Sequence, residues 1–290
     1  MFVIMNSRNS SMPSTEQRDE LLALRYGPQD KPENIIWNDT ITALLRHRSV
    51  RFYRPDPLPD GALETIVAAA QAASNSSNLH QWSVVAVTDP ALKARIAETS
   101  RANGVGNPYI EQAPVFLLWG ADLSRNNAIA GADGDHAIVH EYLDSLVMST
   151  IDASLASQNA AIAAESLGLG ICYIGAMRND ARAVAELIGL PKFSFVTFGM
   201  VVGYPDADAA YRIRPRPAQE VVLHRNRYDV NRSREGLEPY EEAMSAFRAE
   251  LGMTPKTWKE SARSSATEMA YMDGRENLRA TLEDAGFMLR

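Results

Sequence analysis

The feature that most restricts the fold of this chain is a long stretch of small residues that ends at a glycine. Residues 136–167 are rich in Ala and Ser, and Gly168 suits the left-handed position that commonly follows a helix. We therefore expect one long helix over about 136–167, whose small side chains allow another backbone to come close. The apolar run GICYIGAM over 170–177 follows at once and predicts a core strand.

Similar patterns predict a sheet whose strands alternate with helices. Apolar runs between turn residues predict further strands at 82–89, 113–122 and 193–205. Capping residues and helical periodicity predict helices at 39–48, 59–73, 90–100 and 179–190, and charged helical segments at roughly 236–250, 256–271 and 274–286. We expect a single domain over 36–290 with a C-terminal helical excursion, preceded by a polar, loosely ordered extension over 1–35.

Charge and cysteine content limit the possible partners. The formal net charge of -7 argues against nucleic acids and anionic membranes, which require a broad positive field. The single cysteine, Cys172, excludes an intrachain disulfide and favours a reducing, cytoplasmic location. It lies between apolar residues of a predicted strand and is therefore expected in the core. No run reaches the roughly 18 apolar residues needed to span a bilayer.

Positive charge is nevertheless concentrated in two places. The stretch LLRHRSVRFYRP, residues 44–55, combines His47 with four arginines, and Arg212, Arg214 and Arg216 follow much later. Guanidinium groups together with a hydroxyl such as that of Ser49 form a typical phosphate-binding set. Solvated arginines at the end of a helix are the alternative. These residues alone leave both interpretations open.

Other catalytic patterns are weak. The sequence contains no G-x-G-x-x-G, no P-loop and no G-x-S-x-G motif. His136 and His140 are four residues apart and could share a helix face and bind a metal, but no third ligand is indicated, so packed or solvated histidines are favoured. Asp152, Gln158 and Asn159 are expected to form hydrogen bonds at a helix interface rather than to act in catalysis.

Five segments, taken in order, resemble the FMN-dependent nitroreductase family, and most closely its oxygen-insensitive NADPH nitroreductases and flavin reductases. They are HRSVRFY, ASNSSNLHQW, EQAPVFLLW, SQNAAIAAESLGLGICYIGAMRND and GMVVGYPD followed by RPRPA. The match begins near Ile36 and continues to the end of the chain. The resemblance implies an α+β fold with a mainly antiparallel central sheet flanked by helices. It also implies a homodimer with two FMN sites at its interface, in which the C-terminal segments wrap the partner subunit.

By this resemblance, the positive clusters bind the FMN phosphate. The implied residues at the phosphate and ribityl end are His47, Arg48, Ser49, Arg51, Arg214 and Arg216. Asn75, Asn78 and Asn107 match loop positions near the flavin, and Tyr173, Ile174, Gly175 and Ala176 match the backbone along the flavin ring. No side chain is expected to act as a catalytic residue, because the flavin carries the redox chemistry.

The implied activity is ping-pong hydride transfer from NADPH or NADH through FMN to a nitroaromatic, a quinone or a similar electron-poor small molecule. A flavin reductase, a reductive dehalogenase, an ene-type reductase or a non-catalytic FMN-binding dimer are alternatives. The chain departs from the family pattern at His80-Gln81 and at Ala176, where relatives commonly have Gln-Pro and glycine. The preference for NADPH over NADH is open as well, because the segment 250–261 has Lys256 and Lys259 where close relatives have an arginine-rich stretch.

Overall fold

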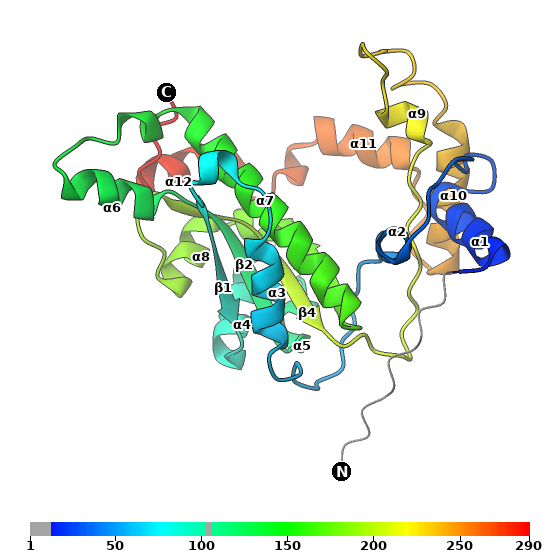
Figure 1. Ribbon diagram of the computed structural model, residues 1–290, viewed down its shortest axis with the longest axis horizontal. Helices are drawn as coiled ribbons and strands as arrows, with labels where there is room; N and C mark the ends of the chain where they lie inside the picture. Colours follow the sequence, from blue (N-terminus) through cyan, green and yellow to red (C-terminus); the bar gives the residue numbers. More distant parts are fainter. Residues whose placement is uncertain (1–12, 102–105) are drawn as a thin grey trace. The chain divides into compact units, whose positions relative to one another are not determined.

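The computed structural model describes residues 13–101 and 106–290, and the chain divides into two compact units (Figure 1). The first, which we call the helical unit, is Met1–Arg48 with Ala210–Thr267. The second, the sheet unit, is Ser49–Ala209 with Glu268–Arg290. The boundary therefore falls inside the first arginine cluster, between Arg48 and Ser49.

A four-stranded antiparallel sheet forms the centre of the sheet unit. Its strand order is β1 (Trp82–Val87), β2 (Val115–Asp122), β4 (Ser194–Gly203) and β3 (Gly170–Ile174). Every residue of β2 is buried, as the continuous apolar run predicts for an inner strand. The expected mainly antiparallel sheet flanked by helices is thus confirmed.

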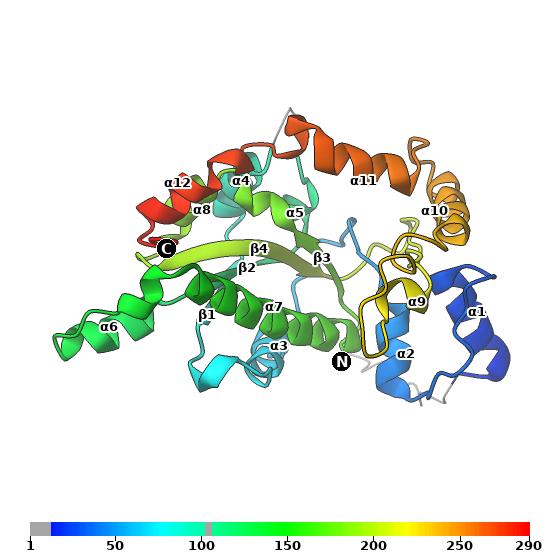
Figure 2. The ribbon, with the colours of Figure 1, turned by 90° about the horizontal axis from the view of Figure 1, so that it is seen from above.

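Helices cover both faces of this sheet (Figure 2). On one face lie α3 (Ala62–Gln71) and α7 (Leu143–Ser166), whose alanines pack against Leu117, Trp119 and Met200. The opposite side carries α4 (Pro90–Thr99), α5 (Tyr109–Gln112) and α8 (Ala181–Ile188). The helices predicted at 59–73, 90–100 and 179–190 are confirmed, with Asp89 and Asp180 as N-caps of α4 and α8.

The remaining elements of the sheet unit are short. They are η1 (Ser76–Asn78), α6 (Ser124–Ala132), η2 (Ile138–Glu141), η3 (Gly175–Arg178), η4 (Met269–Tyr271), η5 (Arg275–Asn277) and α12 (Leu278–Asp284). Leu282 of α12 and the nearby Phe287 join a buried cluster with Ala121 and Phe195. The last predicted C-terminal segment therefore packs on the main body of its own chain.

The extended segment that follows the boundary runs along the edge of β3. Ser49 forms a parallel bridge with Ile171, and Tyr53 forms an antiparallel bridge with Pro205. Val50 packs so tightly here that a Cβ on Gly170 would lie 2.5 Å from its side chain. A glycine at position 170 is therefore required for this edge contact.

The helical unit consists, in its described part, of α1 (Thr15–Tyr26), α2 (Asp39–Arg46), α9 (Gln219–Val222), α10 (Glu238–Glu250) and α11 (Trp258–Thr267). The Asn38 side chain accepts from the backbone N–H of Ile41 and caps α2, as predicted. Tyr240, Met244 and Phe247 of α10 form a small buried core, against which Trp258 packs. This core holds α10 and α11 together.

Two expectations about helices are wrong. The sequence predicts a loosely ordered extension over 1–35, but α1 lies within it and begins with a capping box between Ser14 and Gln17; residues 1–12 lie outside the described part. The long helix predicted from His136 instead begins at Leu143. The helix does not extend toward His136, because the backbone of Arg290 forms hydrogen bonds with the backbones of Glu141 and Leu143. The Arg290 guanidinium also pairs with the Glu141 carboxylate at 2.7 Å.

No helix within the described ranges is long and apolar enough to cross a membrane. Cys172 is 2% exposed, so its predicted place in the core is confirmed.

His136 contacts the Glu141 carboxylate at 2.8 Å, whereas His140 contacts the side-chain amide of Asn127 at 2.8 Å. The two histidines thus bind different partners and share no helix face.

Candidate functional site

Arg25 links the two arginine segments of the helical unit. Arg25 is 5% exposed, and its guanidinium donates to the carbonyls of Leu45 (2.8 Å), His47 (2.6 Å) and Arg214 (2.9 Å). In return its own carbonyl accepts from the backbone N–H of Arg216 at 2.7 Å. Residues 45–47 and 214–216, which are far apart in sequence, therefore lie side by side around one buried side chain.

The arginines that Arg25 brings together are oriented by aromatic rings and carbonyls. The Arg48 guanidinium lies 5.7 Å from the ring centroid of Tyr211, and that of Arg214 lies 5.5 Å from the ring of Phe247. Arg216 donates to the carbonyl of Pro215 at 3.2 Å. Among the described residues, no carboxylate pairs with Arg48 or Arg216, whereas Arg212 pairs with Glu250 at 2.9 Å. The donor set around Arg48 and Arg216 therefore suits an anion.

In the sheet unit, Arg51 and Asn107 meet at Tyr109. The Tyr109 hydroxyl donates to Asn107 Oδ1 at 2.5 Å and also forms a hydrogen bond with the Arg51 side chain. Burial raises the pKa of Tyr109, and the charge of Arg51 opposes that rise. Asn107 also donates to the Ser100 hydroxyl at 3.2 Å. Two residues predicted for one site thus share a hydrogen-bond partner that the sequence did not single out.

The predicted flavin-ring segment lies where the chain leaves the sheet. Ile174 is the last residue of β3, and Gly175 and Ala176 open η3. The Tyr173 ring contacts Phe198 edge-on at 5.4 Å between centroids, and its hydroxyl donates to Ser157 of α7 at 3.3 Å. Burial raises the pKa of Tyr173 to about 12, so its phenol is neutral at physiological pH.

Asn75 and Asn78 belong to a polar segment that also rests on α7. The Ser76 N–H donates to Asp152 Oδ1 at 2.9 Å, and Asp152 is 2% exposed. The Asn159 amide donates to the carbonyl of Ala69 at 3.2 Å, so the predicted hydrogen bonds are confirmed for Asp152 and Asn159, whereas Gln158 is exposed.

The long helix α7 therefore carries both of these pieces. Asp152 supports the segment with Asn75, and Ser157 supports Tyr173, five residues further on. Five helical residues span roughly 7.5 Å along the axis but turn by roughly 140°, so the two side chains leave α7 toward different sides. A cavity of about 450 Å³ opens beside the first of them, lined by Ser74, Asn75, Ser76, Asp144, Val147, Met148, Ile151, Asp152 and Leu155.

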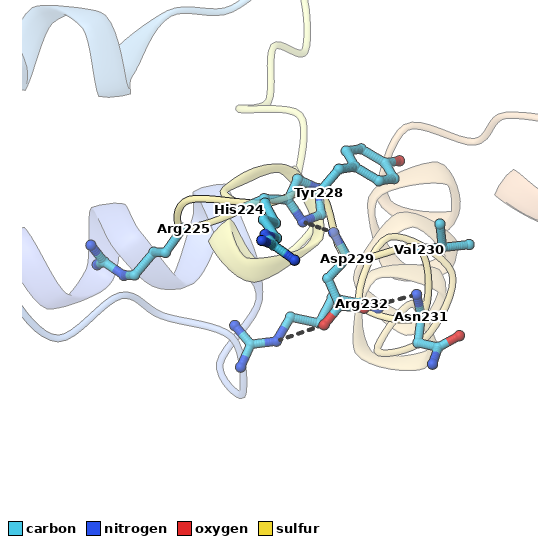
Figure 3. A pocket seen from close by; sticks show the side chains of 8 residues that line it. His224, Arg225, Tyr228, Asp229, Val230, Asn231 and Arg232 are labelled. Carbon is cyan, nitrogen blue, oxygen red and sulfur yellow. Dashed lines mark hydrogen bonds and ion pairs between the residues drawn. The ribbon is translucent and has the colours of Figure 1, made fainter.

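A separate basic cavity of about 550 Å³ lies in the helical unit (Figure 3). It is lined by His224, Arg225, Arg227, Tyr228, Asp229, Val230, Asn231 and Arg232. Arg232 lies 3.8 Å from Asp229, and Arg225 points away from the Asp229 side chain (Figure 3). None of the predicted flavin residues contributes to it, so we do not include it in the candidate site.

The sequence did not reveal several residues that contact these groups, namely Arg25, Tyr109, Tyr211 and Arg125, whose guanidinium donates to the carbonyls of His80 and Trp82. Only Arg25 has a sequence pattern that could have indicated its place in the structure. The S-x-x-Q capping box at Ser14 marks the start of a helix, and Arg25 lies in its last turn. The other three act through contacts between segments distant in sequence, which have no local pattern.

Comparisons with known proteins agree with this architecture. The model of the "Nitroreductase family" matches residues 44–204, and that of the "Nitroreductase family, C-terminal domain" matches residues 214–290. An "FMN reductase (NADPH)" of Bacillus subtilis (strain 168) is 37% identical over 229 residues, which cover 77% of this chain and 89% of the relative.

Solved structures show the same similarity. NfrA2 of B. megaterium superposes with a TM-score of 0.80 at 30% identity, covering 88% of this chain and 100% of that one. The NADPH:FMN oxidoreductase from Vibrio harveyi, solved in complex with NAD+, gives a TM-score of 0.75 at 31% identity, covering 87% of this chain and 100% of that one. The two family matches account for the whole chain from residue 44 onward apart from a short connection, and the chain therefore belongs to the nitroreductase family.

Proposed function

We propose that this protein is an FMN-dependent NAD(P)H oxidoreductase that reduces electron-poor small molecules such as nitroaromatics and quinones. The relatives named as an FMN reductase and as an NADPH:FMN oxidoreductase support the cofactor, the electron donor and the reaction class. One structural observation carries the proposal: Arg25 holds the backbones of two arginine-bearing segments together. Such an arrangement fits a phosphate group carried by a cofactor.

The residues of the chain would bind and orient this cofactor. We assign its phosphate and ribityl end to His47, Arg48, Ser49, Arg51, Arg214 and Arg216, and its ring to Asn75, Asn78, Asn107, Tyr173, Ile174, Gly175 and Ala176. Bound FMN would supply the redox chemistry, which is hydride transfer from NAD(P)H to the electron acceptor. The guanidinium groups supply positive charge, which favours the anionic reduced state of such a cofactor. We assign no proton transfer to a side chain.

The direct test is a visible absorption spectrum of the purified protein. We expect a yellow protein whose flavin absorbance near the visible maximum is lost on anaerobic addition of NADPH or NADH and returns when a quinone or nitroaromatic is added. A protein that binds FMN but turns over no acceptor would be a non-catalytic flavin-binding dimer. A colourless protein that does not bind added FMN would contradict the whole proposal. Comparing NADPH with NADH at equal concentration gives the donor preference.

Replacing Arg51 with alanine should weaken FMN binding. A charge-assisted bond to phosphate contributes about 1.5–3 kcal/mol, so the dissociation constant should rise by roughly 10- to 100-fold. Arg54→Ala is the matched control, because Arg54 lies three residues away, pairs with Asp56 at 2.9 Å and stacks over Tyr204. Fluorescence titration of FMN measures both variants. Equal affinity of Arg51→Ala and the wild type would remove Arg51 from the site.

We also propose that the protein is a homodimer, in which α7 contributes to the interface. Leu143, Val147, Ile151 and Leu155 recur every four residues on α7 and are between 45% and 53% exposed in the single chain. A continuous exposed apolar stripe of this kind usually marks an interaction surface. Because α12 packs on its own chain, α11 is the C-terminal segment that would wrap the partner.

We also propose a cytoplasmic location, which the single cysteine favours.

A further inference from the structure

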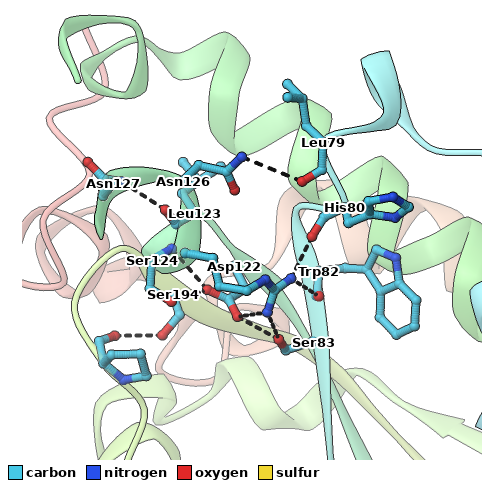
Figure 4. Close-up of polar contacts among 12 residues, drawn as sticks. Leu79, His80, Trp82, Ser83, Asp122, Leu123, Ser124, Asn126, Asn127 and Ser194 are labelled. Carbon is cyan, nitrogen blue, oxygen red and sulfur yellow. Dashed lines mark hydrogen bonds and ion pairs between the residues drawn. The ribbon is translucent and has the colours of Figure 1, made fainter. Parts of the chain in front are cut away.

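We propose that Arg125, held by Asp122, is a positioning residue that fixes the backbone of residues 75–80. Figure 4 shows Leu79, His80, Trp82, Ser83 and Asp122 around this contact. This inference rests on the proposed function, because Asn75 and Asn78 lie in that segment and are assigned to the flavin ring. Arg125 itself would touch neither the cofactor nor the substrate. It would act by holding the carbonyl end of the segment in one conformation.

The backbone of this segment is strained and needs support. Ser77, Asn78 and His80 have φ values of 50°, 57° and 51°, in the left-handed region that L-residues other than glycine rarely adopt. Such conformations persist only where the surroundings impose them, and they concentrate at functional sites. Asparagine and histidine adopt this region more often than most other residues, so Ser77 is the clearest outlier of the three.

Arg125 supplies support at the C-terminal end of the segment. Its Nη2 donates to the carbonyls of His80 (2.5 Å) and Trp82 (2.8 Å), while its Nη1 donates to the Ser83 hydroxyl (2.8 Å). The planar guanidinium fork thus joins the strained segment to the first residues of β1. A lysine ammonium on a flexible stem cannot reproduce this planar set of bonds.

Asp122 in turn fixes Arg125. It is the last residue of β2, is 7% exposed, and its Oδ2 lies 3.0 Å from Arg125 Nη1. Burial would raise the pKa of Asp122, but hydrogen bonds from Ser124 and Ser83 and the charge of Arg125 outweigh burial and hold it below the ordinary value. The carboxylate is therefore ionised at neutral pH, and the guanidinium is anchored to the central sheet.

Independent contacts hold the other end of the segment. Asp152 of α7 accepts from the Ser76 N–H, and Asn75 Oδ1 accepts from the His80 N–H at 3.1 Å. Asn126, next to Arg125 in α6, reaches the carbonyl of Leu79 at 3.5 Å. The segment is thus attached at both ends, while Ser77 and Asn78 are exposed between them. Releasing the Arg125 end should let the exposed residues leave the conformation that presents their side chains.

The test compares holoenzymes carrying Arg125→Ala, Arg125→Lys and the control Arg182→Ala. Arg182 is an exposed arginine of the same unit that pairs with Asp284 and contacts no residue of the segment. For Arg125→Ala we expect amide hydrogen exchange of the peptide covering 75–82 to accelerate, and the visible circular dichroism of bound FMN to change. The KM for a quinone should rise by about 10-fold with a smaller change in kcat, because displacement of positioning groups misplaces the bound substrate. Arg125→Lys should recover little of this loss, and Arg182→Ala should behave as the wild type.

The outcomes separate this inference from the proposed function. If the wild type neither binds FMN nor reduces the quinone, the proposed function is wrong. If the wild type is active and Arg125→Ala retains its exchange rates, flavin dichroism and KM, only the positioning role is wrong. Should Arg125→Ala fail to fold, Ser83→Ala offers a milder perturbation, because Ser83 bonds to both Arg125 and Asp122. An unaltered KM and flavin spectrum in folded Ser83→Ala and Arg125→Lys would then overturn the inference.

Discussion

Arg25→Ala is expected to lower the free energy of unfolding of the helical unit by about 3–5 kcal/mol and to abolish tight FMN binding. The replacement leaves the carbonyls of Leu45, His47 and Arg214 without their buried cationic donor, and each hydrogen bond to a charged group contributes about 1.5–3 kcal/mol. It also releases the two arginine segments from one another. Urea unfolding followed by circular dichroism and FMN titration measure the two effects.

Two further variants make this prediction specific. Arg25→Lys keeps the charge but has a single nitrogen in place of three, so its stability should lie between those of the wild type and Arg25→Ala. Arg212→Ala removes an exposed arginine that pairs with Glu250, and the change should stay within about 1 kcal/mol. Stability and FMN affinity of Arg25→Ala equal to those of Arg212→Ala would show that the buried guanidinium does not organise the site.

Ile151→Glu is expected to convert the proposed homodimer into monomers. Ile151 is 53% exposed and lies in the middle of the apolar stripe on α7. Placing an unpaired carboxylate in a closed interface costs several kcal/mol, and each 1.4 kcal/mol weakens association tenfold, so the dimer dissociation constant should rise by at least roughly 100-fold. Sedimentation velocity at micromolar concentration detects this change.

The control for the dimer prediction is Ala94→Glu. Ala94 is an exposed residue of α4, which covers the opposite face of the sheet, so the same charge there should leave the dimer intact. A wild-type protein that sediments as a monomer contradicts the dimer itself. A wild-type dimer that survives Ile151→Glu would place the interface elsewhere.

Most of the sheet unit could be predicted because its elements have strong local patterns. The apolar run of β2 and the helix predicted at 179–190 both lie where the structure has them. The start of α7 could not be predicted, since residues 136–142 have acceptable helical composition. It is fixed by Arg290, at the other end of the sequence, whose contacts with Glu141 and Leu143 compete with helical hydrogen bonds.

The sequence could predict which residues belong to the candidate site, but not how they are arranged in space. Charge and resemblance single out Arg48 and Arg214, but their proximity depends on Arg25, which lies in a stretch of unremarkable polar composition. Likewise, the strained backbone at Asn78 depends on Arg125 and Asp152, which come from α6 and α7. A single sequence contains no signal for such long-range contacts.

The contact between Arg25 and Arg214, which are separated by 189 positions, can form only late in synthesis of the chain. Arg25 can reach the carbonyls of Leu45 and His47 soon after they leave the ribosome, but its third acceptor is made only after nearly the whole sheet unit. Contacts this distant are formed late, because closing so long a loop costs chain entropy that only the finished neighbours can offset. We therefore expect the helical unit to be completed only after residue 214 has left the ribosome, and cofactor capture to follow that step.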